Sequence, residues 1–337
     1  MHDLTKRQIQ LLRYIIQSHI QTAAAVSSDY IARLYDVTCS TATIRNEMVA
    51  LESMGYLQQP HTSSGRIPTD KSYRLYVDSL IRMEPLTPQE EKRFNELASQ
   101  QGDIHIMLEQ ATMILGQITH ELAVVLSPSI SHAKFDRMEL LRLSGQKVLV
   151  IIHIHSRSVK TLVLQIKSAF NTETLNRTAS FLNERLSGLT LNSIKNSIRD
   201  RCRDSSNTDP ELLRIFIDYA GDIFHYNEPL HLRTAGTNNI ISQPEFSDKS
   251  LLECLFRVLD DRRSLSAYLQ NQKCPFQVII GQEHADERMK PFSIVSAQYQ
   301  IGTDAGSIGI LGPKRMRYSK IMPLVKKMAK SLSHYIE

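Results

Sequence analysis

The sequence predicts an α+β protein in which an N-terminal winged helix-turn-helix precedes an α/β domain interrupted by a helical insertion. Three observations favour this fold class. Residues 1–54 hold three helical patterns, and a short hairpin with glycine follows them. From Leu122 onward Val, Ile and Leu gather in strand-like runs. Helical patterns then occupy residues 173–226 before strand-like runs return. Strands, helices and strands in that order indicate one domain inserted into another.

The composition provides material for two or three packed domains. The chain has 337 residues, of which 42% are hydrophobic. It has no run of 18 apolar residues and no apolar signal core at its start, so we expect a cytoplasmic protein without a membrane span. The four cysteines form no C-x-x-C pair, which predicts reduced thiols. Residues 1–82 hold nine Lys/Arg and seven Asp/Glu, a net charge of 9 − 7 = +2. The positions of charges therefore matter more than their sum.

The first two helices are expected over residues 4–20 and from Ser27 or Ser28 to about residue 35. In the first helix, Thr5 and Gln8 have the spacing of a capping box. Its apolar residues recur at helical spacing, at Ile9, Leu12, Ile16 and Ile20.

The third helix is expected from Ser40 to Met54, where Gly55 can end it. Polar residues near its start lie off the apolar stripe of Ile44, Met48 and Leu51. Such side chains can read base edges in the major groove, Arg pairing with guanine and Asn with adenine. The DNA contacts predicted for this helix are Ser40, Thr41, Thr43, Arg45 and Asn46. The alternative is a polar face on an ordinary helix, and three tandem helices with a wing argue against it.

A hairpin, the wing, is predicted next, with arms at residues 56–59 and 66–69. Gly65 permits its tight turn. Wings bring polar and basic side chains to phosphates or the minor groove. We therefore expect DNA contacts from His61, Ser63, Arg66 and Lys71. For Arg66 alone, a solvated loop charge is the alternative.

Helices and strands then follow in blocks. Helices are expected over residues 70–82, 89–121 (one or two), 175–186, 191–202, 210–224, 248–259, 264–269 and 319–335. Strands are expected over residues 122–126, 137–143, 147–155, 159–166, 230–234, 277–280, 292–299 and 306–311. These blocks place the domain boundaries at 1–82, 83–172, 173–226 and 227–337.

Two surfaces allow two interpretations each. Around a glycine-containing helix end, four leucines form either local core or a dimer interface: Leu182, Leu186, Leu189 and Leu191. Residues 314–330 carry seven Lys/Arg and no acid, which fits an anion or DNA contact and also fits a solvated basic helix.

The sequence predicts no catalysis. It contains no phosphate-binding glycine loop with lysine, no G-x-S-x-G, no H-E-x-x-H and no Cys/His nucleophile pair. His153 and His155 share a strand face, but no third metal ligand lies near them in sequence. We expect no enzyme activity, no metal and no cofactor.

Residues 40–78 resemble one family closely, the heat-inducible transcription repressors HrcA. The stretches that carry the resemblance are residues 42–46, 55–57, 60–62, 65–71, 73–74 and 76–78. Further similar stretches lie at residues 182–190, 243–246, 280–283 and 309–319, so the resemblance covers nearly the whole chain. Lys314 and Arg317 depart from the threonine and aspartate usual in the family.

The resemblance implies a winged-helix domain and a GAF-like domain that carries an inserted dimerisation domain. It implies a homodimer that binds double-stranded DNA at an inverted repeat, the CIRCE operator. It also implies repression of class I heat-shock chaperone operons until stress, with the chaperonin GroEL as modulator. The alternative is a small-molecule sensor that uses the GAF-like domain as a ligand pocket. A DNA-tethered enzyme is a weaker rival, because the sequence lacks a phosphate loop.

Overall fold

The chain folds into two compact units. The computed structural model describes residues 4–35, 39–61, 64–99, 104–128, 134–144, 146–154, 159–166, 170–203, 208–224, 232–272, 274–301 and 304–333. The larger unit comprises Met1–Ser127, His231–Tyr299 and Gly306–Glu337. The smaller unit comprises Pro128–Leu230 and Gln300–Ala305. No helix among the described residues has the length and apolar character needed to cross a bilayer.

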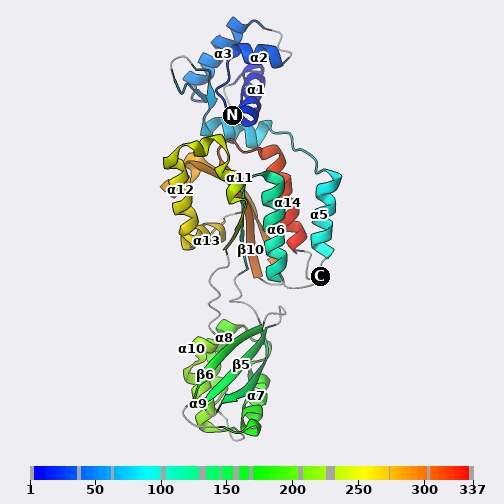
Figure 1. Cartoon of the computed structure of the whole chain (residues 1–337), viewed down its shortest axis with the longest axis vertical. Coiled ribbons are helices and arrows are strands. Elements are labelled where there is room, and N and C mark those ends of the chain that lie inside the picture. The colour runs from blue at the N-terminus through cyan, green and yellow to red at the C-terminus, as the bar shows by residue number, and fades with distance from the viewer. Residues whose placement is uncertain are drawn as a thin grey trace. The chain divides into compact units, whose positions relative to one another are not determined.

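Three helices open the larger unit: α1 (Lys6–Thr22), α2 (Ser28–Leu34) and α3 (Thr41–Ser53) (Figure 1). The predicted capping box begins α1. The Thr5 amide donates to the Gln8 side-chain oxygen at 3.0 Å, and the Gln8 amide donates to Thr5 Oγ1 at 3.3 Å. Ser27 caps α2 in the same way by accepting from the Tyr30 amide. The three predicted helices are confirmed to within two residues.

The wing consists of β1 (Leu57–Gln58) and β2 (Ile67–Pro68), which pair antiparallel. Val26 joins it, since Val26 and Arg66 exchange backbone hydrogen bonds of 2.9 and 2.8 Å. The helix predicted over residues 70–82 divides into α4 (Asp70–Leu75) and a π-helical turn, η1 (Tyr76–Leu80). These elements complete the winged-helix domain.

A five-stranded sheet forms the second part of the larger unit, which we call the sheet domain. Its strand order is β7-β3-β10-β9-β8. The strands are β3 (Leu122–Leu126), β7 (Leu232–Ala235), β8 (Phe276–Ile280), β9 (Phe292–Ile301) and β10 (Asp304–Pro313). Every residue of β3 is buried, because helices cover both faces of the sheet.

One face of this sheet packs against α11 (Thr237–Ile241), α12 (Lys249–Asp260) and α13 (Arg262–Gln270). On the other side lie α5 (Pro88–Ser99), α6 (Ile104–Thr119) and α14 (Tyr318–Ser333) (Figure 1). Short 3₁₀ turns connect the rest: η3 (Pro244–Ser247), η4 (Gly281–Glu283) and η5 (Glu287–Met289).

The smaller unit packs helices against one face of a three-stranded antiparallel sheet. Its strands, in the order β4-β5-β6, are β4 (Phe135–Ser144), β5 (Lys147–Ile154) and β6 (Val159–Gln165). Its helices are α7 (Thr172–Leu186), α8 (Leu191–Arg201), α9 (Pro210–Asp218) and α10 (Ala220–Ile223). Alternate strand residues such as Val148, Val150 and Ile152 share one core with the helices.

This grouping differs from the predicted boundary between residues 172 and 173. The strands of residues 135–165 belong with the helices that follow them rather than with the five-stranded sheet. Periodicity identified these strands but could not say which helices cover them, because both sheets offer an apolar face of the same kind. The inserted unit is therefore α+β and begins near residue 128.

The four leucines that the sequence offered as a dimer interface lie in the core of the smaller unit or pack against it. Leu182 and Leu186 are fully buried and Leu191 is 3% exposed, all within the core of the smaller unit. Leu189 is partly buried and packs against the same core. The burial of Leu182, Leu186 and Leu191 favours the local-core interpretation for these three residues.

Candidate nucleic-acid interface

The start of α3 is fixed by its own hydroxyl groups. Ser40 Oγ accepts a hydrogen bond of 3.2 Å from the Thr43 amide and lies 3.0 Å from Thr43 Oγ1. The first turn of a helix has backbone N–H groups without internal partners, and this cap satisfies one of them. Both hydroxyls, predicted as DNA contacts, therefore already hold the helix start in place.

The remaining polar residues of α3 are presented to solvent. Ile44, Met48 and Leu51 are at most 4% exposed and bind α3 to the domain core. Thr41, Arg45 and Asn46 lie off this stripe and are exposed. Within the described part of the chain, the side chains of Arg45 and Asn46 have no hydrogen bond or ion pair. They are free to bind base edges or phosphates.

The tip of the wing is closed by local hydrogen bonds. The Ser64 amide donates to the His61 carbonyl at 2.9 Å, and the His61 amide donates to Ser64 Oγ at 3.0 Å. His61 itself is exposed, as predicted for a contact residue. Ser63 lies outside the described residues. A Cβ at Gly65 would overlap the Val26 carbonyl, so this position needs glycine for a close approach rather than for a turn.

Arg66 and Lys71, the two cations predicted on the wing, both have partners within the winged-helix domain, and Lys71 is exposed. Arg66 Nε donates to Glu52 Oε2 at 2.9 Å, and its side chain is only 17% exposed. Lys71 Nζ donates to the Met54 carbonyl at 2.9 Å and lies 4.2 Å from the centre of the Tyr56 ring. Arg66 joins the wing to α3, and the carboxylate of Glu52 compensates its charge. Lys71 joins α4 to the end of α3.

The basic C-terminal segment likewise has internal partners. Lys314 Nζ lies 2.8 Å from Asp70 Oδ1, and Arg317 Nη2 lies 2.9 Å from Glu84 Oε2. Arg315 Nη2 donates to Glu245 Oε2 at 2.9 Å, and its Nη1 donates to the Ile20 carbonyl at 3.2 Å. This segment therefore binds the winged-helix domain and its linker to the sheet domain. The solvated-face interpretation remains for the exposed Lys326 and Lys330 further along the segment.

A further ion pair joins the same two domains. Arg74 Nε of α4 donates to Glu283 Oε1 of η4 at 2.7 Å, and Arg74 Nη2 donates to the Val278 carbonyl of β8 at 2.6 Å. The Asp70 carboxylate accepts from the amide of Gln282 at 2.9 Å. These partners are about 200 residues apart in sequence. No local pattern could have paired them.

The described residues contain no cluster of three His, Cys, Asp or Glu side chains that could hold a metal ion. Among the described residues, the first turns of α3 carry the exposed side chains of Arg45 and Asn46 without partners, and the β1–β2 hairpin follows α3. This arrangement defines the class of winged-helix transcription regulators, in which α3 is the recognition helix.

The comparison with known families gives the particular family. Residues 3–79 match the winged helix-turn-helix transcription repressor, HrcA DNA-binding family, and residues 105–322 match the HrcA protein C terminal domain. The chain belongs to the HrcA family.

Similar proteins span the whole chain. The heat-inducible transcription repressor HrcA of Chlorobium chlorochromatii is 39% identical, over 98% of this chain and 97% of its own. That of Chlorobium phaeobacteroides strain BS1 is 37% identical, over 99% and 98%. A crystal structure of a hypothetical protein shares the fold with a TM-score of 0.65 and 23% identity, over 99% of both chains.

Proposed function

We propose that this protein represses class I heat-shock chaperone operons by binding an inverted-repeat operator as a homodimer. Membership of a family of heat-inducible repressors supports this function. The observation that carries it is the recognition helix, whose Arg45 and Asn46 side chains are exposed and have no partner among the described residues. Repression would follow from occlusion of the promoter.

In this proposal, Arg45 and Asn46 read base edges and Thr41 contacts a phosphate. Arg donates two hydrogen bonds to guanine O6 and N7, and Asn pairs similarly with adenine. The hydroxyls of Ser40 and Thr43 keep the helix start in place, where its free N–H groups favour a phosphate. His61 supplies the wing contact. Arg66 acts by holding the wing against α3, and Lys71 by holding α4 against the end of α3.

An inverted repeat needs two recognition helices related by a two-fold axis. The open face of the sheet in the smaller unit offers a surface for the second copy. Leu141, Leu149 and Val163 stand side by side across its three strands. Leu141 and Val163 are 48% and 52% exposed, and Val159 is also 52% exposed. Exposed β-branched and leucine side chains in adjacent rows favour a protein partner.

We infer that the chaperonin keeps the repressor active and that its diversion to unfolded proteins relieves repression. Support for this step comes from the family alone. Its test is whether added GroEL raises the fraction of chain that binds operator after a heat pulse.

A gel shift tests the proposed function directly. The protein is titrated onto a fragment with an intact inverted repeat, a fragment with one half-site scrambled and a fragment with both scrambled. We expect tight binding to the intact repeat only, in a complex of one homodimer with one DNA fragment. Equal affinity for all three fragments at physiological salt would overturn operator recognition, since non-specific binding depends on charge alone.

A further inference from the structure

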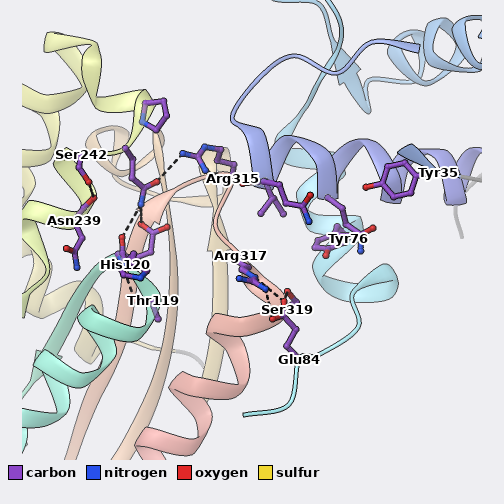
Figure 2. Close-up of a pocket in the computed structure, with 16 residues that line it drawn as sticks. Tyr35, Tyr76, Glu84, Thr119, His120, Asn239, Ser242, Arg315, Arg317 and Ser319 are labelled. Atoms are coloured by element: carbon purple, nitrogen blue, oxygen red, sulfur yellow. Dashed lines mark hydrogen bonds and ion pairs between the residues drawn. The ribbon is translucent and has the colours of Figure 1, made fainter. Parts of the chain in front are cut away.

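A cavity of about 830 Å³ lies between the winged-helix domain and the sheet domain (Figure 2). One wall comes from α1 and η1, including Gln17 and Tyr76. The opposite wall comes from the end of α6, from α11 and from the segment before α14. This volume falls in the range of small-molecule sites, which commonly occur between domains.

Of the charged side chains that the structure describes around this cavity, some have an ion-pair partner and one does not. Arg315 is bound to Glu245, and Figure 2 shows Arg317 reaching Glu84, which also accepts from Ser319 Oγ. Glu121 differs from these groups. Its Oε2 accepts 2.7 Å from the Gln243 side-chain amide, and it has no ion pair within the described part of the chain. Among the described lining residues, Glu121 is thus an acid without a direct ion pair, and the nearest positive charge is that of Arg315, which is itself paired with Glu245.

Two glycines, Gly312 and Gly236, lie directly against Glu121. Glu121 is only 6% exposed. A Cβ at Gly312 would lie 2.6 Å from Glu121 Oε2. Gly236 has φ +89°, and a Cβ there would overlap the Glu121 carbonyl. A side chain at Gly312, in β10, would therefore crowd the Glu121 carboxylate, whereas one at Gly236 would meet only the backbone of Glu121.

A buried carboxyl group without a cation costs stability, because its charged form loses hydration without compensation. Burial raises the pKa of Glu121 to about 8, and the hydrogen bond from Gln243 and the positive charge of Arg315 oppose that shift only in part. Buried acids of this kind concentrate at functional sites. The operator-binding function gives Glu121 no role, since it lies outside the recognition helix and the wing.

We propose that this cavity binds a small organic amine, whose ammonium group pairs with Glu121 and whose body contacts α1 and η1. The Tyr35 ring, which stacks on Tyr14, also lines the winged-helix side of the cavity (Figure 2). A ligand in this place touches both domains, so its binding free energy depends on their arrangement. The protein would then respond to a soluble amine as well as to heat.

Calorimetry with three four-carbon probes tests the sign of the charge. The probes are 1,4-diaminobutane, the neutral 1,4-butanediol and the anionic succinate. We expect heat of binding with the diamine alone. Binding of succinate in preference would assign the cavity to anions through Arg317, and binding of none of the three would also overturn the proposal.

Glu121→Gln keeps the size and the hydrogen-bonding capacity of the side chain and removes its charge. We expect diamine affinity to fall about tenfold or more, as for loss of a charge-assisted contact. Glu253→Gln is the matched control, because Glu253 is an exposed acid of α12, with 71% of its side chain accessible. Equal diamine affinity in both variants would contradict the proposal. Thermal melts of both variants confirm that they are folded.

Proton release gives an independent readout. The groups around the Glu121 carboxyl are Arg315, Glu245 and the Tyr318 hydroxyl, and His120 lines the same cavity. Because burial raises the pKa of Glu121 to about 8, pairing with an ammonium at pH 7 should release a proton. The measured heat should therefore differ between phosphate and Tris buffers, and this difference should vanish in Glu121→Gln. A buffer-independent heat in the wild type would place the amine away from Glu121.

Discussion

At the scale of single residues, what an arginine can do depends on whether it already has a partner. Arg45 is exposed and has no ion pair within the described part of the chain, whereas Arg66 is paired with Glu52. Both are arginines in a DNA-binding domain, and sequence alone predicted DNA contacts for both. The two arginines differ because Arg66 binds the carboxylate of Glu52, which lies 14 residues before it in the sequence.

Arg45→Ala should weaken operator binding by roughly 1–3 kcal/mol and flatten base preference at one position in each half-site. The reason is loss of a side chain that can bond both guanine acceptors. Gel shifts on a set of half-site variants measure this, with Arg93→Ala of α5, an exposed arginine of the sheet domain, as the control. An unchanged base preference in Arg45→Ala would exclude it as a base reader.

Arg66→Ala should cost about 1 kcal/mol of unfolding free energy, since its ion pair with Glu52 is partly buried. Glu52→Gln should cost a similar amount, and the double variant should cost no more than either single change. The salt dependence of DNA binding should stay as in the wild type. A salt slope lowered by about one unit would instead return Arg66 to the phosphate contacts first predicted.

Glu121→Gln should remove a pH dependence of stability. The pKa of Glu121 is raised from 4.5 to about 8 in the folded chain, so its contribution to stability is greatest below pH 4.5 and falls as pH rises toward 8. As pH rises from 4.5 to 8, the unfolding free energy of the variant should increase relative to that of the wild type by at most about 1.4 kcal/mol per pH unit. Urea unfolding at pH 5, 6.5 and 8 measures the gain, and parallel curves would show that burial does not perturb Glu121.

At the scale of elements, periodicity and caps predicted helices and strands well. The α1 capping box, the hydroxyl start of α3 and the strand runs after Leu122 all appear within a few residues of the predicted positions. The turn at Tyr76–Leu80 was missed, because a π-helix has no distinct apolar pattern. Assignment of β4–β6 to a domain also failed, because periodicity reports which face of a strand is buried and not what covers it.

In the smaller unit, Leu186 lies in the core and Leu141 lies on the open face of the sheet. Substitutions at these two kinds of position test the proposed dimer. Leu141→Asp with Val163→Asp places two charges on the open sheet face and should give monomers that remain folded. Sedimentation measures the mass, and far-UV circular dichroism checks the fold. Leu186→Ala is the contrast: it should cost about 2–5 kcal/mol of stability without selectively dissociating a dimer. A charged double variant that still sediments as a dimer would place the interface on another surface.

At the scale of the larger unit, ion pairs join the winged-helix domain to the sheet domain. Arg74 with Glu283, Lys314 with Asp70 and Arg317 with Glu84 all link segments more than 200 residues apart. Sequence analysis found the basic segment and could not find its partners, because the acids are scattered along the chain. Tertiary structure alone brings them together.

Replacing Arg74 and Lys314 by alanine should loosen this junction. We expect the single calorimetric unfolding transition of the larger unit to broaden or divide, because the two domains would no longer melt together. High salt should reduce the effect of the substitutions, since the pairs are partly exposed and screened. An unchanged transition at low salt would show that apolar contacts alone couple the two domains.

The order of strands in the five-stranded sheet has a consequence for how the chain is made. Strand β3 lies between β7 and β10, which follow it by more than 100 and 170 residues. On the ribosome, the run Leu122–Leu126 emerges early and must wait for nearly the whole chain before both of its neighbours exist. Long-range pairing of this kind folds slowly and leaves apolar edges open to aggregation. Translation of residues 127–313 therefore sets how long β3 remains without both of its neighbours.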